Sequence, residues 1–333
     1  MLIRLKMFSK QCILAKRRRK LLMRNLRLHM RDFVFKGLDI LPARMLTSFI
    51  LAISLFSHDV YAIDLQPGDI VAPPPDLNVI QSAYQISKRG DTYSNDKKLP
   101  YSTQLSSSQL QLRYTHTFEI EAVPSVFYVQ TPIGYMHPGK ALSSAYKPEA
   151  GVGDTTMVYA FWPYVNREEK RYWALGAYLT LPTGHYDPSN GVVNMGGNRS
   201  TYALQTGYQM PLGQDVSWMT ALDAVWFGDN SEFMSKTGIV AKTQAVLYTL
   251  QNGLSYDINL KTTVSAVYFY TAGGETALGG AAQSDETQLQ RYQLSLASKF
   301  SFGKLVLQYG ADLSTKNGLI EDSRIIVRYL KAF

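Results

Sequence analysis

The sequence is almost free of cysteine, because Cys12 is the only one in 333 residues. It can therefore form no intramolecular disulfide and offers no pair of thiolates to a metal. Glycine-rich phosphate loops and HExxH motifs are absent as well. Charged residues make up only 18% of the chain, which is little for the surface of a soluble enzyme. We therefore expect no cofactor and no metal site.

Net positive charge is confined to the N-terminal part of the chain. The net charge is +8, yet thirteen of the 34 lysines and arginines lie within residues 1–44. A nucleic-acid partner would depend on this basic leader alone, so none is expected. Residues 1–29 resemble upstream translated sequence, with Met30 or Met45 as alternative starts. The other interpretation of the leader is a basic arm that binds nucleic acid or anionic lipid.

No apolar run is long enough for a membrane-spanning helix. The longest candidate, 46–56, has about 11 residues, whereas a spanning helix needs roughly 20. It is followed by Val60 and Ala62, which are small residues at the −3 and −1 positions of a signal peptidase site. Residues 45–62 are therefore predicted to be a secretory signal cleaved after Ala62, with a short buried helix as the alternative. The mature chain would begin at Ile63.

The rest of the chain alternates between apolar and polar residues, as strands do. At the C-terminus, Ile325, Val327 and Tyr329 alternate with Arg324 and Arg328. The pattern predicts about twelve strands, at residues 80–88, 109–120, 125–133, 155–165, 171–182, 200–211, 216–227, 243–256, 261–271, 290–300, 304–313 and 323–333.

The links between these strands alternate between long and short. Long links are expected near residues 89–107, 134–152, 184–198, 229–241 and 273–286. Sorted loop lengths are typical of an outer-membrane barrel, whereas a soluble sandwich has no reason to sort them. A sheet in lipid must also close on itself. We predict an all-β, transmembrane, antiparallel up-and-down barrel over residues 79–333, preceded by a Pro-rich segment at 63–78, in the outer membrane of a Gram-negative bacterium.

The chain ends on an aromatic residue. Phe333, with Tyr329 among the apolar residues at alternate positions before it, resembles the signal that the bacterial barrel-assembly machinery recognises. That machinery, outer-membrane lipid and lipopolysaccharide are the expected macromolecular and lipid partners.

Charged residues on the polar faces of the strands are the candidates for a lumen lining. They are Arg113, Glu119, Arg291, Lys299, Asp312, Arg324 and Arg328. Twelve strands enclose a narrower lumen than the sixteen of a porin, so these charges either line a conducting path or pair across the lumen as filler. The Pro-rich stretch at 71–78 cannot readily form a helix or an inner strand. It either enters the lumen as a plug or stays in the periplasm.

Other polar groups suggest weaker hypotheses. His185 and Asp187 could contribute to a cation site or to an outer-membrane protease, but a surface turn is the simpler interpretation. Acidic residues at 229–232 and 285–287 could bind the divalent cations that bridge lipopolysaccharide. A phospholipase would need a serine beside an imidazole, and His116 has no serine two residues away on its face. We predict no catalytic residues and no enzyme.

Several short motifs occur together over residues 63–333. They comprise Pro67, Gly68, Asp69, Pro73, Pro74, Gly153, Asp154, Pro182, Thr183, Gly184, Asn194, Asn198 and Arg199. This combination resembles the outer-membrane transporter family named for the meta-pathway of phenol degradation, although Ser200 stands where that family usually has an aromatic residue. The resemblance implies a passive outer-membrane channel for aromatic or other apolar small molecules. A structural or surface-interaction barrel without transport is the alternative.

Overall fold

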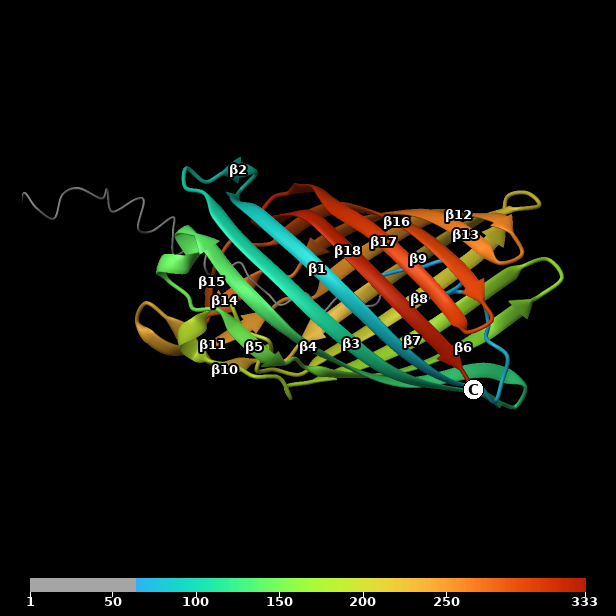
Figure 1. The fold of residues 1–333 in the computed structure, drawn as a ribbon. Helices are drawn as coiled ribbons and strands as arrows, with labels where there is room; N and C mark the ends of the chain where they lie inside the picture. Colours follow the sequence, from blue (N-terminus) through green and yellow to red (C-terminus); the bar gives the residue numbers. More distant parts are fainter. Residues whose placement is uncertain (1–63) are drawn as a thin grey trace, which may run out of the picture. The chain divides into compact units, whose positions relative to one another are not determined.

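The computed structural model describes residues 64–333, so the predicted leader and signal lie outside the described residues. Twelve long antiparallel strands form a closed barrel (Figure 1). They are β1 (Asn78–Ser94), β3 (Thr103–Ile120), β4 (Val123–Lys140), β6 (Thr155–Asn166), β7 (Arg171–Leu181), β8 (Thr201–Pro211), β9 (Val216–Phe227), β12 (Leu247–Asn259), β13 (Thr262–Gly273), β16 (Thr287–Phe300), β17 (Gly303–Thr315) and β18 (Gly318–Ala332). The predicted fold class is confirmed.

The last strand closes the barrel against the first. β18 pairs antiparallel with β1, from Val79 opposite Ala332 to Tyr93 opposite Gly318. The two lie side by side in Figure 1. Phe333 extends the ladder through its backbone, since its N–H donates to the Asn78 carbonyl at 2.9 Å. Closure satisfies the backbone groups of both strands, as a spanning sheet requires.

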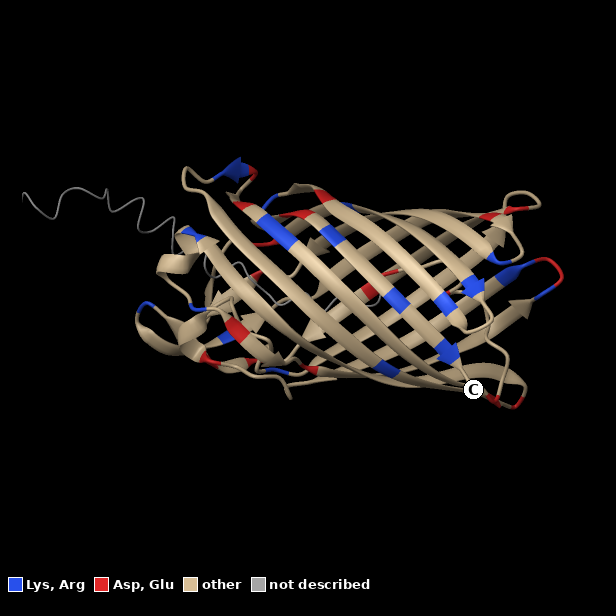
Figure 2. Ribbon diagram, in the orientation of Figure 1, with Lys and Arg blue, Asp and Glu red and all other residues tan. Residues whose placement is uncertain are grey.

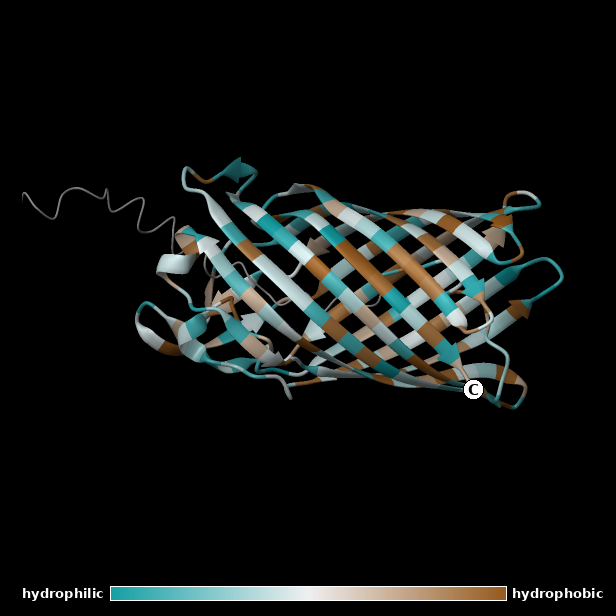
Figure 3. Ribbon diagram, in the orientation of Figure 1, coloured by the Kyte–Doolittle hydropathy of each residue, from teal (hydrophilic) through white to brown (hydrophobic). Residues whose placement is uncertain are grey.

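The two faces of β18 differ as the alternation predicts. Ile325 and Val327 are 45% and 47% exposed, whereas Arg324 and Arg328 are 8% and 7% exposed. Figure 3 shows apolar and polar residues alternating along the strands. Apolar side chains therefore face outward, where lipid would contact them, and the arginines face the lumen. Among residues 64–333, no helix has the length and apolar character needed to cross a bilayer.

The predicted long loops contain more structure than expected. Links 229–241 and 273–286 hold β10 (Asn230–Ser235), β11 (Gly238–Gln244), β14 (Thr276–Leu278) and β15 (Ala281–Ala282), which form a separate four-stranded sheet. The prediction of one strand over 243–256 was therefore wrong, because β11 ends at Gln244 and β12 begins at Leu247. These strands have two to seven residues, too few to show a clear period.

Shorter elements occupy the links at 89–107 and 134–152. They are β2 (Lys97–Lys98), the 3₁₀ helix η1 (Ala141–Ser144) and β5 (Glu149–Val152). A second 3₁₀ turn, η2 (Pro188–Asn190), lies in the link before β8. β1, β3 and β4 also run six to seven residues beyond their predicted ends. The wall is thus taller on this side than the alternation indicated.

The N-terminal segment, residues 64–77, lies inside the barrel. Leu65, Ile70 and Ala72 belong to a buried cluster with inward-facing wall residues that include Trp162 and Phe269. Figure 2 shows acidic residues mainly at the two ends of the barrel, while several basic residues lie along the strands. The interior is therefore a packed lumen in which a separate segment supplies part of the core.

Candidate functional site in the barrel lumen

The first residues of the segment are held by side-chain amides of the wall. The Leu65 N–H donates to Gln251 Oε1 on β12 at 2.9 Å, and Gln293 Nε2 on β16 donates to the Leu65 carbonyl at 3.3 Å. Further along, the indole Nε1 of Trp162 on β6 donates to the Ile70 carbonyl at 2.8 Å. Three strands thus supply hydrogen bonds that the segment, which is not part of any sheet, cannot make for itself.

A buried ion network fixes the start of the segment. Asp64 Oδ1 lies 2.6 Å from Arg291 Nη2, and Asp64 Oδ2 lies 3.2 Å from Arg324 Nη2. Arg324 Nε also lies 3.4 Å from Glu321 Oε2. All four side chains are largely buried, and charges removed from water need such partners. These two lumen arginines therefore anchor the segment.

The Pro-rich part offers carbonyl groups to donors on the wall. Arg167 Nη1 donates to the Ala72 carbonyl at 3.0 Å, and Lys304 Nζ donates to the Pro67 carbonyl at 3.1 Å. Thr117 Oγ1 donates to the Pro74 carbonyl at 2.7 Å. Proline has no N–H, so a segment with Pro67 and Pro73 to Pro75 suits a wall that supplies donors. Within this stretch, Val71 and Pro73 line the cavity, whereas Pro74 and Asp76 are exposed and lie at Thr117, near the end of β3.

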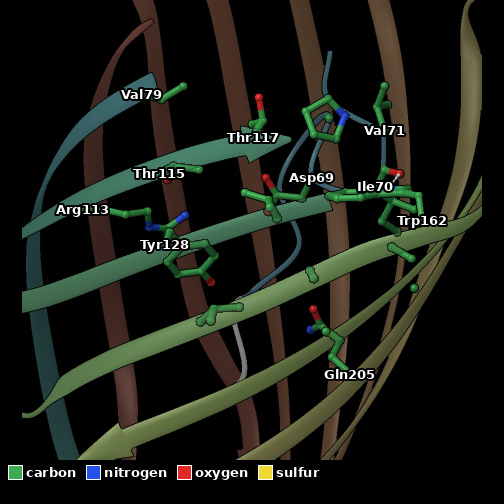
Figure 4. A pocket seen from close by; sticks show the side chains of 18 of the residues that line it. Asp69, Ile70, Val71, Val79, Arg113, Thr115, Thr117, Tyr128, Trp162 and Gln205 are labelled. Atoms are coloured by element: carbon green, nitrogen blue, oxygen red, sulfur yellow. Dashed lines mark hydrogen bonds between the residues drawn. The ribbon is translucent and has the colours of Figure 1, made fainter. Parts of the chain in front are cut away.

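A cavity of about 300 Å³ remains between the segment and the wall. Its apolar lining includes Val126, Val158 and Ala160, and its polar lining includes Asp69 and Arg113. Figure 4 shows these polar side chains entering from the segment and from β3. A cavity of 150 Å³ is enough for benzene, so this one has room for a single substituted aromatic ring.

The predicted lumen residues divide into three groups. Arg113 lines the cavity, and Arg291 and Arg324 pair with Asp64. Arg328 donates from Nε to Gln308 Oε1 at 2.7 Å, and Asp312 Oδ2 accepts from the Glu321 N–H at 2.6 Å. Glu119 and Lys299 are exposed near the ends of their strands and do not line the cavity. A role in conduction stays a prediction for all seven.

The sequence interpretation missed the residues that hold the segment. The sequence did not single out Asp64, Trp162, Gln251 or Gln293 as lumen contacts. Each wall residue of this set falls on the inward register of its strand. Strand parity therefore could have identified them as inward-facing. Their contact with residues more than 90 positions away could not be found locally.

The glycine motifs pack together in the outer loops. A Cβ added at Gly184 would lie 2.7 Å from Gly196 Cα and 2.8 Å from the Gly153 carbonyl carbon. Asp154 links the same loop segments. Its Oδ1 accepts from the Gly184 N–H at 2.8 Å, and its Oδ2 accepts from the Gly197 N–H at 2.7 Å. These residues are needed for close backbone approach.

The remaining motif residues also organise these loops. Asn194 Nδ2 donates to the Asp187 carbonyl at 3.0 Å across the loop, and Asn198 Nδ2 donates to Asn230 Oδ1 at 3.1 Å. Thr183 Oγ1 accepts from the Thr155 N–H at 2.9 Å. Arg199 lies over the Phe227 ring at 4.5 Å, and burial lowers its pKa to about 10.

The two histidines considered for a cation site or for catalysis, His185 and His116, contact other side chains of the protein. His185 Nδ1 lies 3.1 Å from Glu149 Oε1, and Asp187 accepts from the Ser189 N–H as the cap of η2. Within residues 64–333 no group of three or more His, Cys, Asp or Glu is placed to hold a metal. His116 Nδ1 lies 3.0 Å from Asn78 Oδ1, and its strand neighbours across the ladder are Asn78 and Phe127. No serine stands opposite it.

Comparison with known proteins is consistent with this architecture. The family model described as "Putative MetA-pathway of phenol degradation" matches residues 87–329. The chain belongs to this family. A solved structure similar to this chain is the COG4313 outer membrane channel from Pseudomonas putida F1, with 27% identity and a TM-score of 0.76 over 81% of this chain and 100% of that one.

More distant solved structures share less. The β domain of the Bordetella autotransporter BrkA has 12% identity and a TM-score of 0.49, over 77% of this chain and 99% of that one. The Ralstonia pickettii toluene transporter TbuX has 9% identity and a TM-score of 0.43, over 85% and 98%. At this level of similarity, the two structures indicate nothing about the function of this chain. A search of curated proteins finds no match to this sequence.

Proposed function

We propose that this family member is a passive outer-membrane channel for small aromatic or other apolar molecules. The observation that carries the proposal is the cavity of about 300 Å³ inside a closed barrel, with one wall formed by residues 64–77. Apolar residues such as Val126 and Val158 supply the surface that an apolar solute needs. The similarity to a solved outer membrane channel supports the same function.

The segment in the lumen accounts for selectivity by size. Strands on different sides of the barrel contribute the side chains that hold Asp64, Leu65 and Ile70. A solute must pass through the space that they leave, so large hydrated molecules are excluded. No energy source is needed, because an apolar solute moves down its own concentration gradient.

The route to the membrane follows from the two ends of the chain. We propose cleavage after Ala62, export through the periplasm, and insertion by the barrel-assembly machinery through the strand that ends at Phe333. Tyr329 Oη donates to the Phe302 carbonyl at 2.7 Å, which orders the aromatic cluster at this rim. Outer-membrane lipid would contact the wall, and lipopolysaccharide the outer loops.

Two measurements test the channel. Purified protein in planar bilayers should give small conductance steps that change in Arg113→Ala and Arg291→Ala, and cells that produce the protein should take up a labelled aromatic faster than cells without it. Heat-modifiable migration on gels confirms that each variant is folded. Absence of conductance, of liposome swelling over a range of solutes and of labelled uptake would overturn the proposal.

A structural barrel without transport is the second candidate. The observation in its favour is the lumen filling, since Arg291 and Arg324 are engaged with Asp64 instead of facing open water. This candidate predicts no solute flux in the wild type, so the same experiments separate it from the channel.

A further inference from the structure

Two buried side chains that line the cavity carry polar atoms without a protein partner. Gln81 is 3% exposed and Tyr128 is 7% exposed. Within residues 64–333, Gln81 Nε2 and Tyr128 Oη have no hydrogen-bond partner. A buried donor left without an acceptor costs about 1–3 kcal/mol in a folded protein. Two such groups at one cavity indicate that something other than the protein accepts their hydrogen bonds.

Arg113 lies between them. In the wall, its Cα stands opposite that of Gln81 on β1 and that of Gln130 on β4. Its guanidinium carbon lies 4.3 Å from the centre of the Tyr128 ring. Figure 4 shows these two side chains next to each other. Arg113 Nε donates to Gln130 Oε1 at 3.0 Å. Gln81, Arg113 and Tyr128 form one continuous patch, which we call the donor patch.

The charge around the donor patch is positive. Arg113, Lys304 and Asp69 are the charged residues in the cavity lining. Asp69 is the one acid among them, and its Oδ2 already accepts from the Gln66 N–H at 3.1 Å. The rest of the lining is largely apolar. The lining of the cavity therefore combines hydrogen-bond donors with apolar surface.

We propose that this cavity binds a small aromatic carboxylate. The proposal rests on the channel function and specifies the solute. A carboxylate only accepts hydrogen bonds, so its two oxygens match the donors of Tyr128, Gln81 and Arg113. Its ring occupies the apolar space beside Val126 and Val158. A plain hydrocarbon of the same size leaves every donor unsatisfied, and an amine adds donors where acceptors are needed.

Calorimetry on the folded, detergent-solubilised protein tests the proposal with benzoate and benzyl alcohol, which share a ring and differ in the charged group. We expect benzoate to bind at least about tenfold more tightly than benzyl alcohol, since one charge-assisted bond is worth about this factor. Tyr128→Phe and Gln81→Leu should each weaken benzoate binding by about the same factor. Both variants should leave benzyl alcohol binding within about twofold, because the ring contacts are intact.

Tyr135→Phe is the matched control, because its hydroxyl lies on the exposed face of the same strand, β4, beside His137. It should leave benzoate affinity unchanged. Equal affinity for the two ligands, or unchanged benzoate affinity in folded Tyr128→Phe, would overturn the proposal and show that the donors are satisfied by water. If benzoate does not bind while cells still take up a neutral aromatic, only the carboxylate inference fails. If both are absent, the channel function fails as well.

Discussion

The barrel wall and the segment inside it are held by different kinds of interaction. The wall is a ladder of backbone hydrogen bonds that closes between β1 and β18. The segment at 64–77 depends on a few side chains, chiefly Arg291, Gln251 and Trp162. A ladder tolerates the loss of any one side chain, whereas the segment can be released by single substitutions. We therefore predict that folding of the barrel and opening of its lumen can be separated by substitution.

The largest expected effect comes from the ion network. Asp64→Ala leaves Arg291 and Arg324 buried with less negative charge nearby, and removal of one partner of a buried pair costs about 3–5 kcal/mol. The segment should loosen while the wall stays closed. Planar-bilayer recordings should show larger and noisier conductance with normal heat modifiability. Asp64→Asn, which keeps the shape, is the control and should have a smaller effect. A loss of barrel folding in both variants would contradict the separation.

A charge on the outer face should break the wall instead. Val327→Arg places an arginine on the lipid-facing side of β18, whereas the native Arg328 faces the lumen. The substitution should lower the free energy of unfolding by about 2–4 kcal/mol. Urea unfolding in lipid vesicles, followed by tryptophan fluorescence, should show this loss. Val327→Leu is the matched control and should be near wild type. If Val327→Arg were equally stable, the assignment of this face to lipid would be wrong.

Close packing of backbone holds the loop segments around Gly184. Gly184→Ala forces a Cβ to within 2.8 Å of two other backbone segments, and overpacking of this kind costs about 1–3 kcal/mol. We expect faster protease cleavage in the loops and no change in barrel unfolding. Gly213→Ala, in a turn with no atom within 4 Å of the added Cβ, is the control. Equal protease resistance in both variants would contradict the close packing.

The smallest expected effect concerns one hydrogen bond of the segment. Trp162→Phe removes the donor to the Ile70 carbonyl and costs about 1 kcal/mol. Because the mature chain is predicted to lack cysteine, Val71→Cys can report exposure of the segment by maleimide labelling. Labelling should rise about fivefold in Trp162→Phe. Trp173→Phe, on the exposed outer face of β7, should leave the labelling rate unchanged. An equal rise in labelling in the two variants would indicate that the substitutions loosen the barrel wall and not the segment.

The difference between wall and segment also explains how much of the molecule could be predicted. Period two in residues such as Ile325 and Val327 is a local property, and it predicted twelve strands and their faces. Sorted link lengths and the apolar period together indicated closure. The four-stranded sheet of β10, β11, β14 and β15 was missed because its strands are short and pair across two separate links.

The candidate site was less predictable because it depends on pairs distant in sequence. Arg291 and Arg324 were predicted to face the lumen from strand parity alone, but their partner Asp64 lies 227 residues from Arg291. Proline content predicted that residues 71–78 form no helix and no inner strand, and it left both the lumen and the periplasm as possible locations. The donor patch of Gln81, Arg113 and Tyr128 requires three strands to be aligned in register, which no single segment reveals.

We propose that residues 64–77 close most of the lumen of a barrel that is complete without them. Deletion of residues 64–73, with Pro74 to Leu77 and their contacts to Thr117 kept, should therefore change the conductance in planar bilayers. We expect a folded, heat-modifiable barrel whose single-channel conductance is several times that of the wild type. Unchanged conductance in a folded deletion variant would show that the segment does not close the lumen.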